Sequence, residues 1–196
     1  MIIVIDHHDS FVHTLARYFR QEMMTVEVVR SDMFDVDTII KRQPTAIIFS
    51  PGPGNPKQIP NSVALVRKAE AMIPMLGVCL GHQLIAAAYG AEINRHPPAH
   101  GVTAMIEHTG DALFRNIPPV FPAGRYHSLI AEKLPAGLSP IAHGPDDQIM
   151  AFKHEVHPVY GVQFHPESIL TPHGNQLIRN FLKISRHGMQ AKEEMS

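Results

Sequence analysis

Apolar residues in the first ninety positions follow two alternating patterns. Residues 2–5 form a continuous apolar run, as expected for a strand buried on both faces of a sheet. Further strand-like segments lie at 26–29, 46–49 and 75–78, and segments with helical spacing lie at 11–19, 36–40, 62–72 and 82–89. Asp9 and Ser10 are candidate N-caps of the first helix, and Gly90 closes the last one. Repeated strand–helix units predict a parallel α/β sheet whose ligands bind at the carboxyl ends of the strands.

The pattern changes after residue 91. Short strand-like runs, divided by Pro and Gly, lie near 102–107, 137–142, 148–153 and 159–164. We expect them to add partly antiparallel strands to the sheet. Residues 174–184 predict a final helix that packs Leu177, Ile178, Phe181 and Leu182. This pattern favours one domain over residues 1–186 and a flexible tail over residues 187–196.

Composition narrows the classes of function. A chain of 196 residues with 44% hydrophobic residues is long enough for one core. The apolar opening ends at Asp6, so neither a membrane span nor a signal peptide is predicted. A net charge of −1 gives no indication of a nucleic-acid or acidic-membrane surface. The single cysteine, Cys79, excludes an intrachain disulfide and favours a reducing, cytoplasmic setting.

Cys79 is a candidate nucleophile. It lies in Gly77-Val78-Cys79-Leu80-Gly81, between a predicted strand and a predicted helix, which is the cysteine form of the G-x-S-x-G elbow. The glycines leave room for a sharp turn, and the helix N-terminus favours the thiolate. The N–H of Leu80 is then available as an oxyanion donor. A buried, inert cysteine is the competing interpretation, but two glycines at a strand–helix junction favour the nucleophile.

A base for this nucleophile lies far along the chain. An apolar run leads into His165, and Glu167 follows two residues later, so in an extended segment both side chains point to one side. Glu167 can then hold one imidazole nitrogen while the other faces the sulfur. A lone H-x-E is more often a strand-end histidine beside a solvated glutamate, but the separate cysteine elbow reverses that preference.

Ser50-Pro51-Gly52-Pro53-Gly54-Asn55-Pro56 predicts a stiff loop at the end of a strand. Because the loop carries little side chain, its backbone N–H groups can approach a ligand oxygen closely. We expect a second oxyanion donor near Gly54. An ordinary connecting turn is the alternative, and no G-K-[ST] follows to indicate phosphate binding.

Together these motifs resemble those of class I (triad-type) glutamine amidotransferases. Within that family the chain is similar to the small subunits of anthranilate synthase and of 4-amino-4-deoxychorismate (para-aminobenzoate) synthase. The resemblance rests on five segments in family order, at residues 9–11, 50–54, 77–83, 125–129 and 161–168.

The resemblance implies a three-layer α/β fold around a central mixed, mostly parallel sheet. It implies Cys79, His165 and Glu167 as a catalytic triad. The implied contacts with glutamine are Gly52, Gly54, Leu80, Gln83, Ser128 and Leu129. It further implies that the chain hydrolyses L-glutamine and passes ammonia to a larger, chorismate-binding synthase subunit. No metal or cofactor is implied for this chain, because Mg²⁺ belongs to the synthase subunit.

Several alternatives stay open at this point. The subunit can serve the tryptophan branch, the folate branch or both. A stand-alone γ-glutamyl cysteine hydrolase shares the elbow and the triad, and a non-catalytic binding subunit is a third class, against which the intact triad argues. On paper His7, His8 and His13, or His154 and His157, form a zinc site, but no matching spacing motif supports one.

Four residues depart from the usual family pattern. His7 and His8 stand where the family has Asn and an aromatic residue, and Val102 and Ala104 stand where it has Lys and a nearby Ser. We expect these positions in loops near the partner, where they affect coupling between subunits rather than glutamine hydrolysis.

Overall fold

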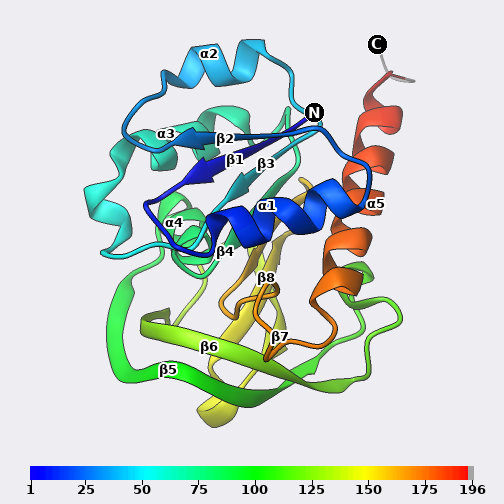
Figure 1. Cartoon of the computed structure of the whole chain (residues 1–196). Helices are drawn as coiled ribbons and strands as arrows, with labels where there is room; N and C mark the ends of the chain where they lie inside the picture. The colour runs from blue at the N-terminus through cyan, green and yellow to red at the C-terminus, as the bar shows by residue number, and fades with distance from the viewer. Residues whose placement is uncertain (194–196) are drawn as a thin grey trace.

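The structure is a computed structural model that describes the backbone of residues 1–193 and the side chains of residues 1–186 (Figure 1). Its strands are β1 (Ile2–Asp6), β2 (Val26–Arg30), β3 (Ala46–Phe49), β4 (Met75–Val78), β5 (Ile93–His108), β6 (Val120–Ala131), β7 (Leu138–His143), β8 (Ile149–His154) and β9 (Val159–Val162). Its α-helices are α1 (Val12–Gln21), α2 (Val36–Lys41), α3 (Pro60–Ala69), α4 (Leu80–Ala88) and α5 (Gly174–Glu193). Each strand and helix predicted in the first ninety residues is present, with ends shifted by at most three residues.

Within residues 1–193, the nine strands form one sheet in the order β2-β1-β3-β4-β9-β8-β7-β5-β6. Neighbouring strands from β2 to β9 run parallel, and neighbouring strands from β9 to β6 run antiparallel. The sheet is therefore mixed, as expected. Val78 at the end of β4 lies opposite Val162 at the end of β9. Two segments far apart in the sequence thus leave the sheet side by side.

Helices cover both faces of the parallel strands, which gives three layers (Figure 1). Successive side chains of a strand point to opposite faces. Ile2 and Val4 pack in the core beneath α1 and α5, whereas Ile3 and Ile5 pack in the core beneath α2, α3 and α4. The continuous apolar run of β1 follows from burial on both sides.

The sequence pattern does not predict β6, nor the part of β5 before residue 102. Pro97 and Pro98 lie within β5, and Pro122 and Gly124 lie within β6, so neither segment shows an unbroken strand pattern in the sequence. The two strands pair antiparallel with register shifts between residues 95 and 99 and between residues 100 and 102. The extra residues lie in β5, which pairs with β7 only at Glu107 and His108, so most of its other edge is free and prolines and bulges are tolerated there.

The two ends of the chain also differ from the expected boundaries. Phe11 occupies the N-cap position of α1 without a side-chain cap, and Asp9 instead accepts the N–H of Phe11 at 2.7 Å. α5 extends to Glu193, past the predicted end at residue 184. The domain limit at residue 186 stays a prediction. Residues 194–196, at the end of the proposed tail, lie outside the described residues.

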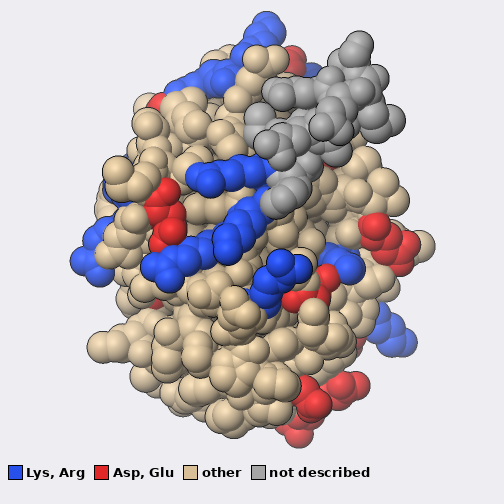
Figure 2. Space-filling model, turned by 90° about the vertical axis from the view of Figure 1, so that its right-hand side faces the viewer, with Lys and Arg blue, Asp and Glu red and all other residues tan. Residues whose placement is uncertain are grey.

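Basic side chains gather on the face that carries α5 (Figure 2). Part of this charge is neutralised, since Nε of Arg179 on α5 lies 2.7 Å from Oε1 of Glu22. With a net charge of −1, the basic grouping is local. Across residues 1–193, no helix has both the length and the apolar character needed to cross a membrane.

Replacing Phe19 by Ala should lower the free energy of unfolding by about 3–5 kcal/mol, because this fully buried ring packs between α1 and the sheet. Urea denaturation followed by circular dichroism measures the change. Met23→Ala is the control: Met23 is 92% exposed, and its loss should change the free energy by less than about 0.5 kcal/mol. An equally small effect of Phe19→Ala would show that α1 does not contribute to this core.

Candidate active site

Cys79 alone forms the corner between β4 and α4. Its backbone has φ 53° and ψ −102°, a conformation that L-residues rarely adopt. Both flanking glycines are needed for steric reasons. A Cβ atom on Gly77 would lie 2.2 Å from the carbonyl oxygen of Gly81, and one on Gly81 would lie 2.2 Å from the carbonyl oxygen of Phe49. The elbow expected from the sequence is present, and both glycines make it possible.

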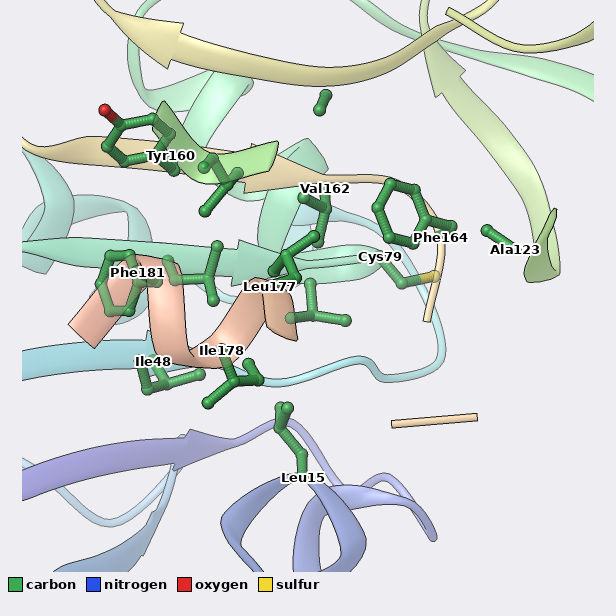
Figure 3. Close-up of a cluster of buried hydrophobic side chains, with 14 of the residues drawn as sticks. Leu15, Ile48, Cys79, Ala123, Tyr160, Val162, Phe164, Leu177, Ile178 and Phe181 are labelled. Atoms are coloured by element: carbon green, nitrogen blue, oxygen red, sulfur yellow. The ribbon is translucent and has the colours of Figure 1, made fainter. Parts of the chain in front are cut away.

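Cys79 lies at the end of the core cluster beneath α1 and α5, beside Phe164 (Figure 3). It is 6% exposed, so the residue is neither open on the surface nor completely enclosed. The N–H of Cys79 donates to the carbonyl oxygen of Val162 at 2.9 Å. This bond ties the corner to the end of β9, the strand that leads to His165.

His165 and Glu167 form a buried pair. Nδ1 of His165 lies 2.7 Å from Oε1 of Glu167, and the two side chains are 3% and 0% exposed. Their local geometry differs from the expected extended segment: β9 ends at Val162, and a turn follows in which the N–H of Ser168 donates to the carbonyl oxygen of His165 at 3.2 Å. The two side chains therefore meet through a tight turn and not through the alternation of a strand.

The backbone and ring of His165 are held from several sides. Its N–H donates to the carbonyl oxygen of Gly124 at 3.0 Å, and its carbonyl oxygen accepts from the hydroxyl of Thr171 at 2.7 Å. The rings of Tyr126 and Phe11 contact the imidazole edge-on, with centroid distances of 4.9 and 6.0 Å. The motif segments at residues 9–11 and 125–129 thus both reach this histidine.

The protonation of His165 depends on opposing effects. Burial disfavours the charged imidazolium, but the Cys79 and Glu167 side chains favour it and raise the pKa of His165 well above its ordinary value. Nε2 of His165 is buried and makes no hydrogen bond of standard geometry with any described side chain.

The glycine–proline loop follows β3 and contacts the elbow. A Cβ atom on Gly52 would lie 3.0 Å from Cδ2 of Leu80 and 2.5 Å from the carbonyl oxygen of His7. Gly54 has φ 83°, in the left-handed region that favours glycine, and it is exposed. Leu80 is the first residue of α4, so its N–H has no acceptor within the helix. The two expected oxyanion donors thus lie on segments that touch each other.

Of the other residues implied to bind glutamine, Gln83 and Leu129 are in direct contact. Nε2 of Gln83 on α4 donates to the carbonyl oxygen of Leu129 on β6 at 2.8 Å. Leu129 also lines a pocket of about 520 Å³ whose wall includes Asn55 and Pro56, at the end of the glycine–proline loop. Ser128, next to Leu129, is exposed. Most of the wall of this pocket comes from the end of α4 and from residues 91–95, and neither Cys79 nor His165 lines it.

A strained cysteine corner, a buried His–Glu pair and a glycine loop thus lie at the ends of three neighbouring strands. The family profile described as "Glutamine amidotransferase class-I" matches residues 3–184. The chain belongs to the class-I glutamine amidotransferase family.

Relatives within this family match this sequence over nearly its whole length. The anthranilate synthase component 2 of Methanothermobacter marburgensis is 42% identical, and the match covers 94% of this chain and 98% of that protein. The aminodeoxychorismate/anthranilate synthase component 2 of Bacillus subtilis is 39% identical, with 95% and 97% covered. The bifunctional protein TrpGD of Thermotoga maritima is 43% identical, and the match spans 93% of this chain but only 32% of that longer protein.

Among solved structures, the chain shares its fold with a putative GMP synthase subunit from Thermoplasma acidophilum. The TM-score is 0.88 at 22% sequence identity, with 98% of this chain and 96% of that chain covered. At this identity the likeness shows the shared fold alone.

His7, one of the departures from the family pattern, is buried and not part of a partner-facing surface. It is 2% exposed, its N–H donates to Oγ of Ser50 at 2.9 Å, and Nε2 lies 3.0 Å from Oγ of Ser62. Burial lowers the pKa of His7 to about 4. A neutral histidine thus joins the ends of β1 and β3 to α3 and supports the glycine–proline loop.

The other three residues that depart from the family pattern differ in location and exposure. His8 is exposed and adopts φ 62°. Val102 and Ala104 lie within β5 and not in a loop, which corrects the expectation from the sequence. Ala104 is 8% exposed, whereas Val102 is 46% exposed. Only His8 and Val102 of the four residues are therefore available to contact another subunit.

Metal binding by the histidines finds no support in the geometry. Among the residues whose side chains are described, no group of three or more His, Cys, Asp or Glu is placed to hold an ion. Nδ1 of His154 accepts the backbone N–H groups of Val156 and His157 at 3.0 and 2.9 Å. This histidine shapes a turn.

Sequence reasoning missed several residues that build the site. Gln163 and Tyr126 lie inside the matched motif segments, so their positions were visible but their contacts were not. Gly124 and Thr171 lie outside those segments and hold the backbone of His165. No local pattern in the chain indicates either contact, because both join segments distant in sequence.

Replacing His7 by Asn should flatten the pH dependence of stability. The folded-state pKa of about 4 lies below the ordinary value of 6.5. The unfolded chain therefore takes up a proton that the folded protein excludes, and stability falls as the pH drops from about 6.5 to about 4. Urea unfolding at pH 7 and pH 4.5 should show an acid loss smaller by about 2–3 kcal/mol in His7→Asn. Exposed His8→Asn is the matched control, and an acid loss in His7→Asn equal to that of the control would contradict this role of His7.

Proposed function

We propose that this chain hydrolyses L-glutamine through a thioester on Cys79 and delivers the ammonia to a chorismate-using synthase subunit. The observation that carries the proposal is the convergence of a strained cysteine at a strand–helix corner with the buried His165–Glu167 pair. Family membership supports the reaction class, and the contacts between these three residues support their roles as nucleophile, acid–base and orienting group.

The first half of the reaction breaks the amide bond. The Cys79 thiolate attacks the side-chain carbonyl carbon of glutamine, and the negative charge moves to the amide oxygen. The N–H groups of Gly54 and Leu80 stabilise that charge, and loss of one such donor typically costs about two to three orders of magnitude in rate. His165 gives its proton to the departing nitrogen, ammonia leaves, and a γ-glutamyl thioester remains on Cys79.

The second half restores the enzyme. His165, now neutral, takes a proton from water, and the hydroxide attacks the thioester carbonyl. Glutamate leaves, the Cys79 thiolate is regenerated, and His165 again carries the proton. The raised pKa of His165 supports this cycle because the histidine is protonated near neutral pH when the amide has to leave.

The synthase chemistry is assigned to a second subunit. No acidic cluster for Mg²⁺ is present among the described side chains. Ammonia becomes protonated in water and loses its nucleophilicity, so an enclosed path into the partner is part of the proposal. Met105 and Val120, which are 54% and 47% exposed, lie on the same side of the β5–β6 pair, because Val120 pairs with Glu107, two residues from Met105, and they support a protein contact there.

The anthranilate (tryptophan) branch is our first assignment for this subunit. Relatives covered almost end to end are named anthranilate synthase component 2, and one is named for both aminodeoxychorismate and anthranilate synthesis. Those names support a synthase subunit over a stand-alone γ-glutamyl hydrolase, and they leave room for a subunit that serves both branches. The cytoplasmic setting inferred from the single cysteine is part of the same proposal.

Replacing Cys79 by Ser should abolish glutamine-dependent synthesis by the reconstituted complex while ammonia-dependent synthesis continues. The hydroxyl is a much poorer nucleophile than the thiolate, whereas the partner's own site is untouched. Product formation from chorismate with glutamine or with ammonium salt measures the two activities. Normal glutamine-dependent turnover by Cys79→Ser would show that Cys79 is not the nucleophile.

Replacing Glu167 by Gln should reduce glutaminase kcat by about 10²–10⁴-fold and move the alkaline fall of activity to lower pH. The carboxylate favours protonated His165, so without it the histidine loses its proton at lower pH. A pH profile of glutamate release tests both effects. Exposed Glu155→Gln is the control, and an alkaline limb at the same pH in Glu167→Gln as in that control would exclude Glu167 as the orienting carboxylate.

A further inference from the structure

Gln163 lies between the end of β9 and His165, and the steps above do not use it. Its side chain is fully buried. Nε2 of Gln163 donates to Sγ of Cys79 at 3.7 Å, within hydrogen-bonding range of a sulfur atom. A buried amide N–H therefore faces the atom that carries the thiolate charge.

The orientation of this amide is fixed by its neighbours. A backbone carbonyl can only accept, so Leu129 requires the NH₂ group of Gln83, which donates to it at 2.8 Å. The same NH₂ group can only donate, so Gln163 must present its oxygen, which accepts at 3.1 Å. The NH₂ group of Gln163 is thereby turned toward Cys79, since the opposite orientation would place two NH₂ groups against each other.

The carbonyl group of Leu129, which accepts the hydrogen bond from Gln83, is itself held in place. Nδ1 of His127 lies 3.2 Å from the carbonyl oxygen of Leu129, and Nε2 lies 3.2 Å from Nε of Arg125. Because arginine can only donate, Nε2 accepts and Nδ1 carries the hydrogen that Leu129 accepts. Burial and the Arg125 charge lower the pKa of His127 to about 4, so the ring is neutral near pH 7 and keeps this direction.

We propose that Gln163 is a further catalytic residue, whose amide N–H stabilises the Cys79 sulfur in its thiolate form, and that Gln83 positions that amide. This inference rests on the function proposed for Cys79. A charged acceptor strengthens a hydrogen bond, whereas a neutral thiol accepts only weakly, so the bond favours the thiolate over the thiol. The effect comes from the protein alone and precedes substrate binding.

The same bonds restrict how Gln83 can meet a substrate. Both hydrogens of its NH₂ group are used, one on Leu129 and one on Gln163. A bound glutamine therefore meets the oxygen of Gln83, unless it displaces one of these bonds. Gln83 thus connects the implied glutamine contacts with the nucleophile.

Alkylation by iodoacetamide tests the role of Gln163 without glutamine or a partner, because Cys79 is the single cysteine of the 196-residue chain. The rate should rise with pH to a plateau as the thiolate forms. In Gln163→Met, which keeps the volume but removes the donor, the midpoint should move upward by about one pH unit. Below the midpoint the variant then reacts about tenfold more slowly, while the plateau rate is retained.

Asn180→Leu is the matched control. Asn180 is another buried amide on α5, and its Nδ2 donates to the carbonyl oxygens of Leu113 and Arg115. Its loss removes buried hydrogen bonds without touching Cys79, so the alkylation midpoint should stay at the wild-type pH. A midpoint that moved equally in Asn180→Leu and Gln163→Met would reflect general loosening of the fold and would overturn the proposal.

Two further variants cover the case in which Gln163→Met does not fold. Gln163→Glu is nearly isosteric and places an acceptor with negative charge at the sulfur, so its midpoint should move upward at least as far. Gln83→Met leaves Gln163 in place but releases its orientation, and should give a smaller upward shift. If folded Gln163 variants keep the wild-type alkylation midpoint, the role of Gln163 is overturned and the function proposed for Cys79 is not. If Cys79 of the wild-type protein stays unreactive at every pH, the function proposed for Cys79 is overturned as well.

Discussion

The turn from β4 into α4 places Cys79 at φ 53° and ψ −102°, a backbone conformation that costs on the order of 1–3 kcal/mol and persists only where the surroundings impose it. Here the surroundings are the neighbouring strands. Gly81 lies against the backbone at Phe49 in β3, and the N–H of Cys79 is bound by Val162 at the end of β9. The site therefore forms only when β3, β4 and β9 stand side by side, so the chemistry depends on the completed sheet.

The order of strands explains why distant segments supply one site. The carboxyl ends of parallel strands share one edge of the sheet. β1 brings His7 to that edge, β3 brings the glycine–proline loop, β4 brings Cys79, and β9 brings Gln163 and His165. The antiparallel part contributes from the side, since β6 carries Tyr126 against the imidazole and Leu129 against Gln83. The parallel and the antiparallel part of the sheet thus both contribute residues around the Cys79 sulfur.

The sequence patterns predicted the features that depend on residues close together in the chain. The parallel strands and their helices were visible because burial on both faces gives continuous apolar runs, and the elbow was visible because only glycines fit at residues 77 and 81. β6 was missed because Pro122 and Gly124 lie within it and break the strand pattern of the sequence, and because its partner strand is irregular. His7 was misplaced because its burial depends on Ser50 and Ser62, which no pattern near residue 7 reveals. The turn between His165 and Glu167 was read as a strand, although the contact between the two side chains was anticipated.

A mass measurement on the quenched complex tests the central claim most directly. The full-length chain, combined with a synthase partner and glutamine, is stopped with acid during turnover, digested and analysed by mass spectrometry. A γ-glutamyl group on the peptide that contains Cys79, absent without glutamine, is the result that the account predicts. Steady release of glutamate with Cys79 unmodified, or with the glutamyl group on another residue, would contradict it.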